Sequence, residues 1–164
     1  MDIPNFKFAL REDLLDSPNF IPVQGEPFST GWDCSAAPAD RKPIVIRPGT
    51  YFAIPLGIRM FAPEGWWMQL NPRSSSFVKK HIHSLYGVID NHFENELKFC
   101  GTYLPDPRDL GKDLVINFGD RIGQLIPIQR QQMIVECISN EEYDKQAAER
   151  GGIRGIGGFG STGG

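Results

Sequence analysis

Glycine and proline interrupt the chain at short intervals from residue 18 to residue 127 and divide it into short segments. These segments are rich in β-branched and aromatic residues, as in "PIVIRPG" and "TYFAIPLGIRMFAP". Polar and apolar residues alternate in Glu96–Phe99, the pattern of a strand with one buried face. Short strands separated by turns at roughly 8–12-residue spacing predict an all-β sandwich or barrel.

Two segments have a helical pattern. Ser75–His81 ("SSFVKKH") begins with serine and continues as a short amphipathic turn or two, while Asn140–Arg150 ("NEEYDKQAAER") predicts a short helix or a charged linker. Because helices do not alternate with strands, the pattern disfavours a doubly wound nucleotide-binding fold. The apolar run Met133–Ile138 is one of the segments expected to form strands.

The length of 164 residues suits a single domain with its own core. We expect a β domain over residues 1–143, irregular at residues 1–28, followed by a C-terminal arm over residues 144–164. Residues 150–164 contain eight glycines, which lose the most conformational entropy when they become ordered. By composition alone, the arm is a disordered end, a linker remnant, or a segment that orders over a ligand.

Charge and cysteine usage limit the class of protein. The formal net charge is −3 without a basic excess, which argues against a nucleic-acid-binding surface. Cys34, Cys100 and Cys137 are widely spaced and form no CxxC pair, which indicates free thiols in a reducing compartment. No apolar run approaches the length of a membrane span, and the first residues lack the apolar stretch of a signal peptide. We therefore expect a cytoplasmic protein without a membrane span.

Several residues suit phosphate or water chemistry, each with a structural alternative. "NPRSSSF" places Arg73 and three hydroxyls before a helix start, where free N–H groups and a guanidinium suit a phosphate. The alternative is that a serine only caps the helix. "GVID" ends at Asp90, which either acts chemically at the tip of a hairpin or accepts bonds from its own turn. Gln124 is either a buried amide with partners or a solvent-facing side chain.

The C-terminal arm has the composition of a phosphate cradle, because successive glycine N–H groups can converge on an anion. It is not a Walker loop, since no lysine precedes its serine and threonine. Phe159 is suited to cover a flat base, so the arm is expected to close over a nucleotide. His81 and His83 lie two residues apart without a third ligand at a suitable spacing, which favours surface histidines over a metal pair.

Five stretches occur in a fixed order along the chain: "GWDCSAA" from Gly31, "NPRSS" from Asn71, "GVID" from Gly87, "GDRIGQL" from Gly119 and "RGIGGFGSTG" from Arg154. Together they resemble the five motifs of the trimeric dUTPase family. The resemblance implies a jelly-roll-like β-barrel or sandwich, assembled as a homotrimer with active sites shared between subunits. It also implies hydrolysis of dUTP to dUMP and pyrophosphate, limiting uracil incorporation into DNA, with Mg²⁺ held mainly by the substrate phosphates.

The resemblance implies roles for individual residues. Asp90 would position the water that attacks the α-phosphorus and would contact the sugar 3′-hydroxyl. A free carboxylate is a weak base at neutral pH, so orienting the water is the better description of that role. Arg73 would bind phosphate beside Gln124, and Asp33 would support the site and contact a magnesium-bound water. The implied substrate-binding residues are Ser74, Ser75, Ser84, Gly87, Val88, Ile89, Phe93, Lys98, Arg154, Phe159, Gly160, Ser161 and Thr162.

Ser84–Lys98 would form a hairpin that holds the nucleoside, with backbone groups contacting the uracil. In the family the hairpin aspartate is followed by x-x-Tyr-x-Gly, whereas this chain has Phe93 and Asn95 at those two positions. The ring of Phe93 would still exclude a ribose 2′-hydroxyl. In the arm, Arg154 would contact phosphate, Phe159 would stack on uracil, and residues 160–162 would wrap the terminal phosphates.

Two other functions stay open at this point. dCTP deaminases share the fold, but their proton-shuttling glutamate lies on the strand after the hairpin, where this chain has Phe99-Cys100-Gly101. A nucleotide-binding or repressor-binding protein without catalysis would also keep the fold. Against it, the chain retains the residue types that catalysis needs at Asp90 and Arg73. No regulatory partner is identified by the sequence.

Overall fold

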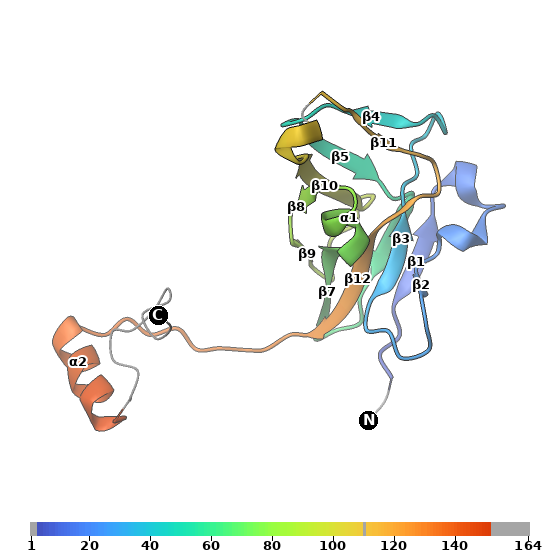
Figure 1. Ribbon diagram of the computed structural model, residues 1–164. Coiled ribbons are helices and arrows are strands. Elements are labelled where there is room, and N and C mark those ends of the chain that lie inside the picture. The colour runs from blue at the N-terminus through green and yellow to red at the C-terminus, as the bar shows by residue number, and fades with distance from the viewer. Residues whose placement is uncertain (1–2, 110, 152–164) are drawn as a thin grey trace. The chain divides into compact units, whose positions relative to one another are not determined.

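The computed structural model of the chain describes residues 3–109 and 111–151 (Figure 1). The chain divides into two compact units, residues 1–131 and residues 132–164. All strands among the described residues belong to the first unit. They are β1 (Lys7–Leu10), β2 (Val23–Gln24), β3 (Trp32–Ser35), β4 (Ile44–Ile46), β5 (Tyr51–Pro55), β6 (Ile58–Phe61), β7 (Trp66–Pro72), β8 (Ile82–Ser84), β9 (Gly87–Ile89), β10 (Lys98–Tyr103), β11 (Leu114–Ile116) and β12 (Arg121–Gln129).

The strands form four antiparallel sheets. The largest has the order β2-β3-β12-β7-β9, and the others are β5-β10-β8, β11-β4 and β1-β6. β12 is the centre of the largest sheet, with β3 on one side and β7 on the other, as Figure 1 shows. The predicted all-β fold class is confirmed.

Period-two alternation builds the core. In β5 the side chains of Phe52 and Ile54 are buried, while those of Tyr51 and Ala53 face outward. All four sheets contribute buried apolar side chains to one main cluster, which accounts for most of the hydrophobic stabilisation of the unit. Its fully enclosed members include Ile54, Leu56, Ile58, Ile82, Leu97, Phe99, Ile116, Ile122 and Leu125.

The helical segments are short. The 3-10 helices are η1 (Glu12–Leu14), η2 (Pro18–Phe20) and η3 (Pro107–Asp109), and the α-helices are α1 (Ser74–Val78) and α2 (Asn140–Glu149). The α2 prediction is confirmed, with Ser139 Oγ accepting the Glu142 N–H at 3.1 Å as an N-cap. No helix in the described part of the chain is long and apolar enough to cross a membrane.

The first helix is shorter than the predicted Ser75–His81. His81 has φ of 51°, in the left-handed region, and its N–H donates to the Phe77 carbonyl at 3.0 Å. The His81 carbonyl in turn accepts the Leu104 N–H at 3.0 Å. This left-handed turn stops α1 and leads the chain into β8.

Two regions differ from the expected organisation. The N-terminal segment is more regular than expected, because Lys7–Leu10 pairs with β6 along its whole length. The predicted strand at Met133–Ile138 is wrong: residues 130–139 form no strand, and Met133, Ile134 and Val135 are 84%, 98% and 81% exposed. β-branched composition favours a strand only where a neighbouring strand supplies hydrogen bonds, and the described residues of this unit, 132–151, contain no strand.

Candidate active site

A pocket of about 350 Å³ lies where β7 ends and α1 begins. It brings together three of the sequence motifs, because Gln124 on β12 pairs with Asp33 on β3 and with Asn71 on β7. The three motifs therefore form one row across the sheet. The pocket is lined by Gly25, Ser29, Gly31, Asp33, Arg73, Ser74, Ser75 and Gln124.

The Asp33 carboxylate lies between two arginines at this pocket. Its Oδ1 is 2.9 Å from Arg73 Nε, and its Oδ2 is 3.3 Å from Arg121 Nη1. The Asp33 side chain is 9% exposed, so both contacts lie in a partly desolvated setting. Arg121 was not among the predicted site residues, although it stands within the "GDRIGQL" stretch. The pairing fixes the direction from which Arg73 faces the pocket.

Gln124 is a partly buried amide with a partner. Its Nε2 donates to the Pro72 carbonyl at 3.0 Å. Gly31 leaves room for this side chain, since a Cβ at residue 31 would lie 1.9 Å from Gln124 Oε1. The amide therefore has the partner that the first alternative requires, while the side chain is half-buried at the pocket wall. Gly25, Ser29 and Gly31 belong to the β2–β3 connection and were missed, because nothing local in the sequence places that connection over the pocket.

The start of α1 presents polar groups to the same pocket. Arg73 occupies the N-cap position with φ −76° and ψ 152°, and no side chain caps the helix. The hydroxyls of Ser74 and Ser75 are therefore not used as caps. The third serine, Ser76, is fully buried, and its Oγ donates to the Ile122 carbonyl at 2.7 Å. This bond ties α1 to β12 and so fixes the start of the helix beside the pocket.

A second pocket, of about 510 Å³, lies beside the loop that joins β9 to β10. The residues that line it are Ile89, Phe93, Asn95, Glu96, Leu97, Lys98 and Cys100. Three predicted nucleoside residues, Ile89, Phe93 and Lys98, are thus brought together. Asp90 is exposed immediately after β9, and its carbonyl accepts the Phe93 N–H at 3.1 Å.

The other predicted nucleoside residues lie on the strands that approach this pocket. Gly87 and Val88 belong to β9, where they pair with Leu70 and Gln69 on β7. Ser84 lies on β8, and its Oγ is buried without a hydrogen-bond partner in the described part of the chain. An unpaired buried hydroxyl carries a desolvation cost, which a ligand can remove.

The predicted hairpin over Ser84–Lys98 is only partly correct. Its base is paired, because Ser84 on β8 lies opposite Gly101 on β10. β9, however, pairs with β7 and not with β10. Gly87 itself lies opposite Leu70 in this pairing. The loop from Asp90 to Leu97 therefore crosses between two sheets.

The two pockets share no lining residue and lie at different points along β7. Ile89 is opposite Met68, whereas Arg73 follows the far end of the same strand. At about 3.4 Å per residue, Asp90 and Arg73 lie roughly 20 Å apart along the strand direction. The Asp90 and Arg73 side chains therefore do not meet within one copy of the chain.

The donor set at the first pocket suits one particular mode of magnesium binding. Within residues 3–109 and 111–151, no group of three His, Cys, Asp or Glu side chains could hold a metal ion, and His81 and His83 belong to no such cluster. Asp33 is the one carboxylate that lines the pocket. Mg²⁺ is commonly bound by substrate phosphates and waters with one or two carboxylates, so these residues fit an ion that arrives with its nucleotide.

The predicted arm residues lie outside the described residues. They are Arg154, Phe159, Gly160, Ser161 and Thr162.

Comparison with known proteins identifies the family. The family model described as dUTPase matches residues 19–163. The chain belongs to the dUTPase family. The matched range includes all five motifs, so the resemblance found in the sequence is confirmed.

Curated members of the family match almost the whole chain. A deoxyuridine 5′-triphosphate nucleotidohydrolase of Rickettsia canadensis is 34% identical over 166 residues, covering 99% of this chain and 99% of the relative. The enzyme of that name from Caulobacter vibrioides is 33% identical over 161 residues, covering 96% and 93%.

Solved structures of dUTPases share the fold. The Staphylococcus bacteriophage 80alpha dUTPase with dUpNHpp has a TM-score of 0.70 at 19% identity, covering 97% of this chain and 98% of that chain. The Streptococcus mutans dUTPase has a TM-score of 0.65 at 21% identity, covering 78% and 98%.

Proposed function

We propose that this protein hydrolyses dUTP to dUMP and pyrophosphate by attack of water at the α-phosphorus, and so limits uracil incorporation into DNA. The observation that carries the proposal is the pocket in which Arg73, Ser74, Ser75 and Gln124 converge, in a chain of the dUTPase family. The curated relatives are named for this activity.

The first pocket would bind the triphosphate. In-line attack builds negative charge on the phosphoryl oxygens, so cations and preorganised N–H donors lower the barrier. Arg73 offers a guanidinium directed by Asp33, and the start of α1 offers N–H groups with the hydroxyls of Ser74 and Ser75. Mg²⁺ would be held mainly by the phosphates, with Asp33 contacting it through water, and would neutralise charge on the leaving pyrophosphate.

The second pocket would bind the nucleoside. Asp90 would accept a hydrogen bond from the attacking water and orient it, and would also contact the 3′-hydroxyl. Phe93, at the wall of the pocket, would lie against the deoxyribose and exclude a 2′-hydroxyl. The unpaired Ser84 Oγ would gain a partner from the uracil.

We further propose a homotrimer in which each active site draws on more than one copy. The roughly 20 Å that separates Asp90 from Arg73 along β7 supports this arrangement, because the two groups must act on one substrate. Exposed apolar side chains at Leu85, Tyr86 and Val88 beside the nucleoside pocket also suit burial against a second copy. The arm would close such a shared site, with Arg154 and residues 160–162 on phosphates and Phe159 on uracil.

Free thiols support the predicted cytoplasmic location of the enzyme. Cys34, Cys100 and Cys137 form no disulfide. Unpaired cysteines suit a reducing compartment, where deoxynucleotides are also consumed.

The deciding experiment is pyrophosphate release from dUTP, dCTP, dTTP and UTP with Mg²⁺, for the whole protein and for a chain truncated after Glu149. We expect dUTP-selective turnover that collapses on truncation. Asp90→Asn should lower kcat by about 10²–10⁴-fold, since it removes the acceptor that orients the water. Asp113→Asn, at an exposed carboxylate, is the matched control. Ammonia release from dCTP would instead favour deamination, and no turnover by the whole protein would contradict the proposal.

A further inference from the structure

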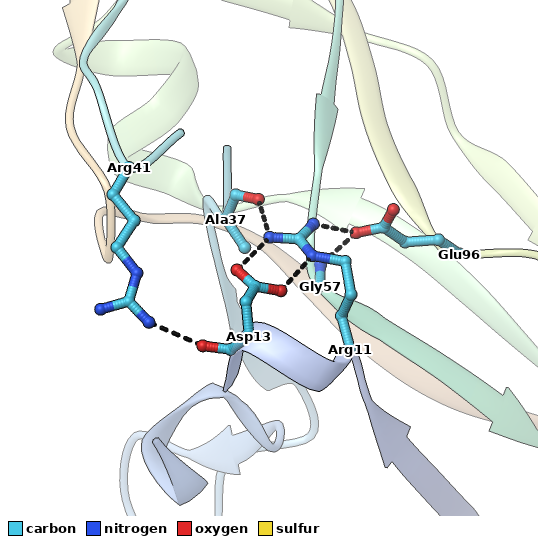
Figure 2. Close-up of polar contacts among 6 residues, drawn as sticks. All are labelled: Arg11, Asp13, Ala37, Arg41, Gly57 and Glu96. Atoms are coloured by element: carbon cyan, nitrogen blue, oxygen red, sulfur yellow. Dashed lines mark hydrogen bonds and ion pairs between the residues drawn. The ribbon is translucent and has the colours of Figure 1, made fainter. Parts of the chain in front are cut away.

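Arg11 joins several segments that are distant in the sequence (Figure 2). Its Nε and Nη2 donate to the two carboxylate oxygens of Asp13 at 2.6 and 3.0 Å. Its Nη1 donates to Glu96 Oε1 at 2.7 Å, and its Nη2 also donates to the Ala37 carbonyl at 2.9 Å. The Arg11 side chain is 24% exposed, so these contacts are partly shielded from water.

The Arg11–Glu96 contact closes a ring through Gly57. Glu96 Oε1 accepts the Gly57 N–H at 2.8 Å, and the Gly57 carbonyl accepts the Arg11 N–H at 2.8 Å. Residue 57 has φ of 68°, and a Cβ there would lie 2.2 Å from a Leu14 methyl group. Because Gly57 is confined in this way, its N–H and its carbonyl hold fixed positions. Glu96 and Arg11 bind to these two groups.

Glu96 is also part of the nucleoside pocket. It ends the loop that begins at Asp90, and it lines the same pocket as Phe93 and Lys98. The next residue, Leu97, is fully buried and donates its N–H to the Ile58 carbonyl at 2.9 Å. The loop therefore joins the rigid part of the protein at Glu96, three residues after Phe93.

We propose that the ring formed by Arg11, Gly57 and Glu96 sets the position of the Asp90–Glu96 loop, and thereby the discrimination between deoxyribose and ribose. Arg11 and Glu96 are positioning residues that act through Phe93. The proposal deepens the proposed function, because it assigns to that enzyme the residues that hold its sugar-facing side chain in place. Without the ring, the end of the loop keeps only the backbone bonds of Leu97, so Glu96 gains freedom and Phe93 can retreat from the 2′ position.

The test is the ratio of kcat/KM for dUTP to kcat/KM for UTP in Arg11→Ala and Glu96→Ala. This ratio does not depend on the fraction of folded protein, so a purely structural role would leave it unchanged. We expect it to fall about tenfold in both variants, the scale of effect produced by a small displacement of a positioning group. Glu96→Gln should restore it, since the amide oxygen can still accept from Arg11 and Gly57.

Arg108→Ala is the matched control. It removes another guanidinium that donates to both oxygens of a carboxylate two residues away, Asp106, at 2.8 and 2.9 Å, and neither residue lines the nucleoside pocket. Its ratio should stay at the wild-type value. An unchanged ratio in Arg11→Ala and Glu96→Ala, or an equal fall in Arg108→Ala, would overturn the proposal while dUTP turnover by the wild type left the proposed function standing.

Calorimetry tests the same proposal without turnover. The quantity measured is the Kd for UMP divided by the Kd for dUMP. A fall of this ratio in the alanine variants supports the ring as a determinant of sugar selectivity. A wild type that binds both nucleotides equally would overturn it. A wild type that prefers dUMP but does not hydrolyse dUTP would contradict the proposed function alone.

Discussion

Arg73 Nε lies 2.9 Å from Oδ1 of Asp33, and this contact joins a residue that follows β7 to one on β3, two strands away. The second oxygen of the same carboxylate meets Arg121 at 3.3 Å. Asp33 therefore directs one cation into the pocket at the start of α1 and balances the charge of a second.

Asp33→Asn should lower kcat/KM for dUTP by roughly tenfold or more, because a misdirected guanidinium no longer meets the phosphoryl oxygens in the transition state. Steady-state kinetics on folded protein would measure it. Asp113→Asn, whose carboxylate is exposed outside the pocket, should behave as the wild type. If Asp33→Asn and the wild type have equal kcat/KM for dUTP, Asp33 has no role in the site.

Gly31→Ala should reduce activity more than stability. The added methyl group would displace the Gln124 amide from the pocket, since the two would lie 1.9 Å apart. We expect kcat/KM to fall by about 10²-fold, with the midpoint of urea unfolding little changed. Gly111→Ala, where a Cβ meets no atom within 4 Å, controls for the substitution itself. Full activity in Gly31→Ala would show that the position of Gln124 is unimportant.

Ser76→Ala should destabilise the fold by about 1–3 kcal/mol, because the buried Ile122 carbonyl loses its hydrogen bond from Ser76 Oγ. Urea denaturation followed by tryptophan fluorescence measures the change. Ser74→Ala, at an exposed hydroxyl of the same helix, should change the free energy of unfolding far less. Similar losses in the two variants would contradict the role assigned to the Ser76 bond.

The three thiols should react differently with an alkylating reagent. Burial raises the pKa of Cys34 to about 12, so this thiol should stay neutral and unlabelled in the folded protein. Cys137 is exposed, and Cys100 is partly exposed at the wall of the nucleoside pocket. In Cys137→Ser, mass spectrometry should find the label at Cys100, and dUMP should slow its incorporation. Labelling at an unchanged rate with saturating dUMP would place the nucleoside elsewhere.

The Arg11–Asp13 pair should make stability depend on acidity. The hydrogen bonds from Arg11 lower the pKa of Asp13 below its ordinary value of 3.8. A lowered folded-state pKa stabilises the fold above the unfolded-state value, and this stabilisation is lost as the pH falls through the folded-state value. Asp13→Asn should therefore lower Tm at neutral pH and have little effect well below pH 3.8. If Asp13→Asn lowers Tm by the same amount at neutral pH and well below pH 3.8, the stabilising ion pair is contradicted.

The grouping of Arg73, Ser74 and Ser75 at one pocket could be predicted because these residues are local in the sequence. Arg73, Ser74 and Ser75 are consecutive, and their types already indicate an anion site between a strand and a helix. The partners of these residues could not be predicted from the sequence. Arg121 meets Asp33 across 88 residues, through strand pairing with a register shift at that point. No local pattern encodes such a register.

The same limit applies to backbone geometry and to isolated strands. The left-handed conformation of His81 ends α1 early. Histidine adopts it more often than most non-glycine residues, but its presence alone does not predict where such a turn falls. Met133–Ile138 has the composition of a strand but no neighbouring strand among residues 132–151, and composition does not supply one. Fold class and motif chemistry were therefore accessible, whereas contacts that depend on which strands pair were not.

The spacing of Asp90 and Arg73 along β7 has a genetic consequence. If each site takes its water-orienting carboxylate from one copy and its phosphate-binding guanidinium from another, then Asp90→Asn and Arg73→Ala damage different partners of the same site. Two inactive gene products would then restore activity when they are co-expressed, whereas a product carrying both substitutions would rescue neither. Alleles of this gene would be expected to complement within the gene, according to which pocket each one alters.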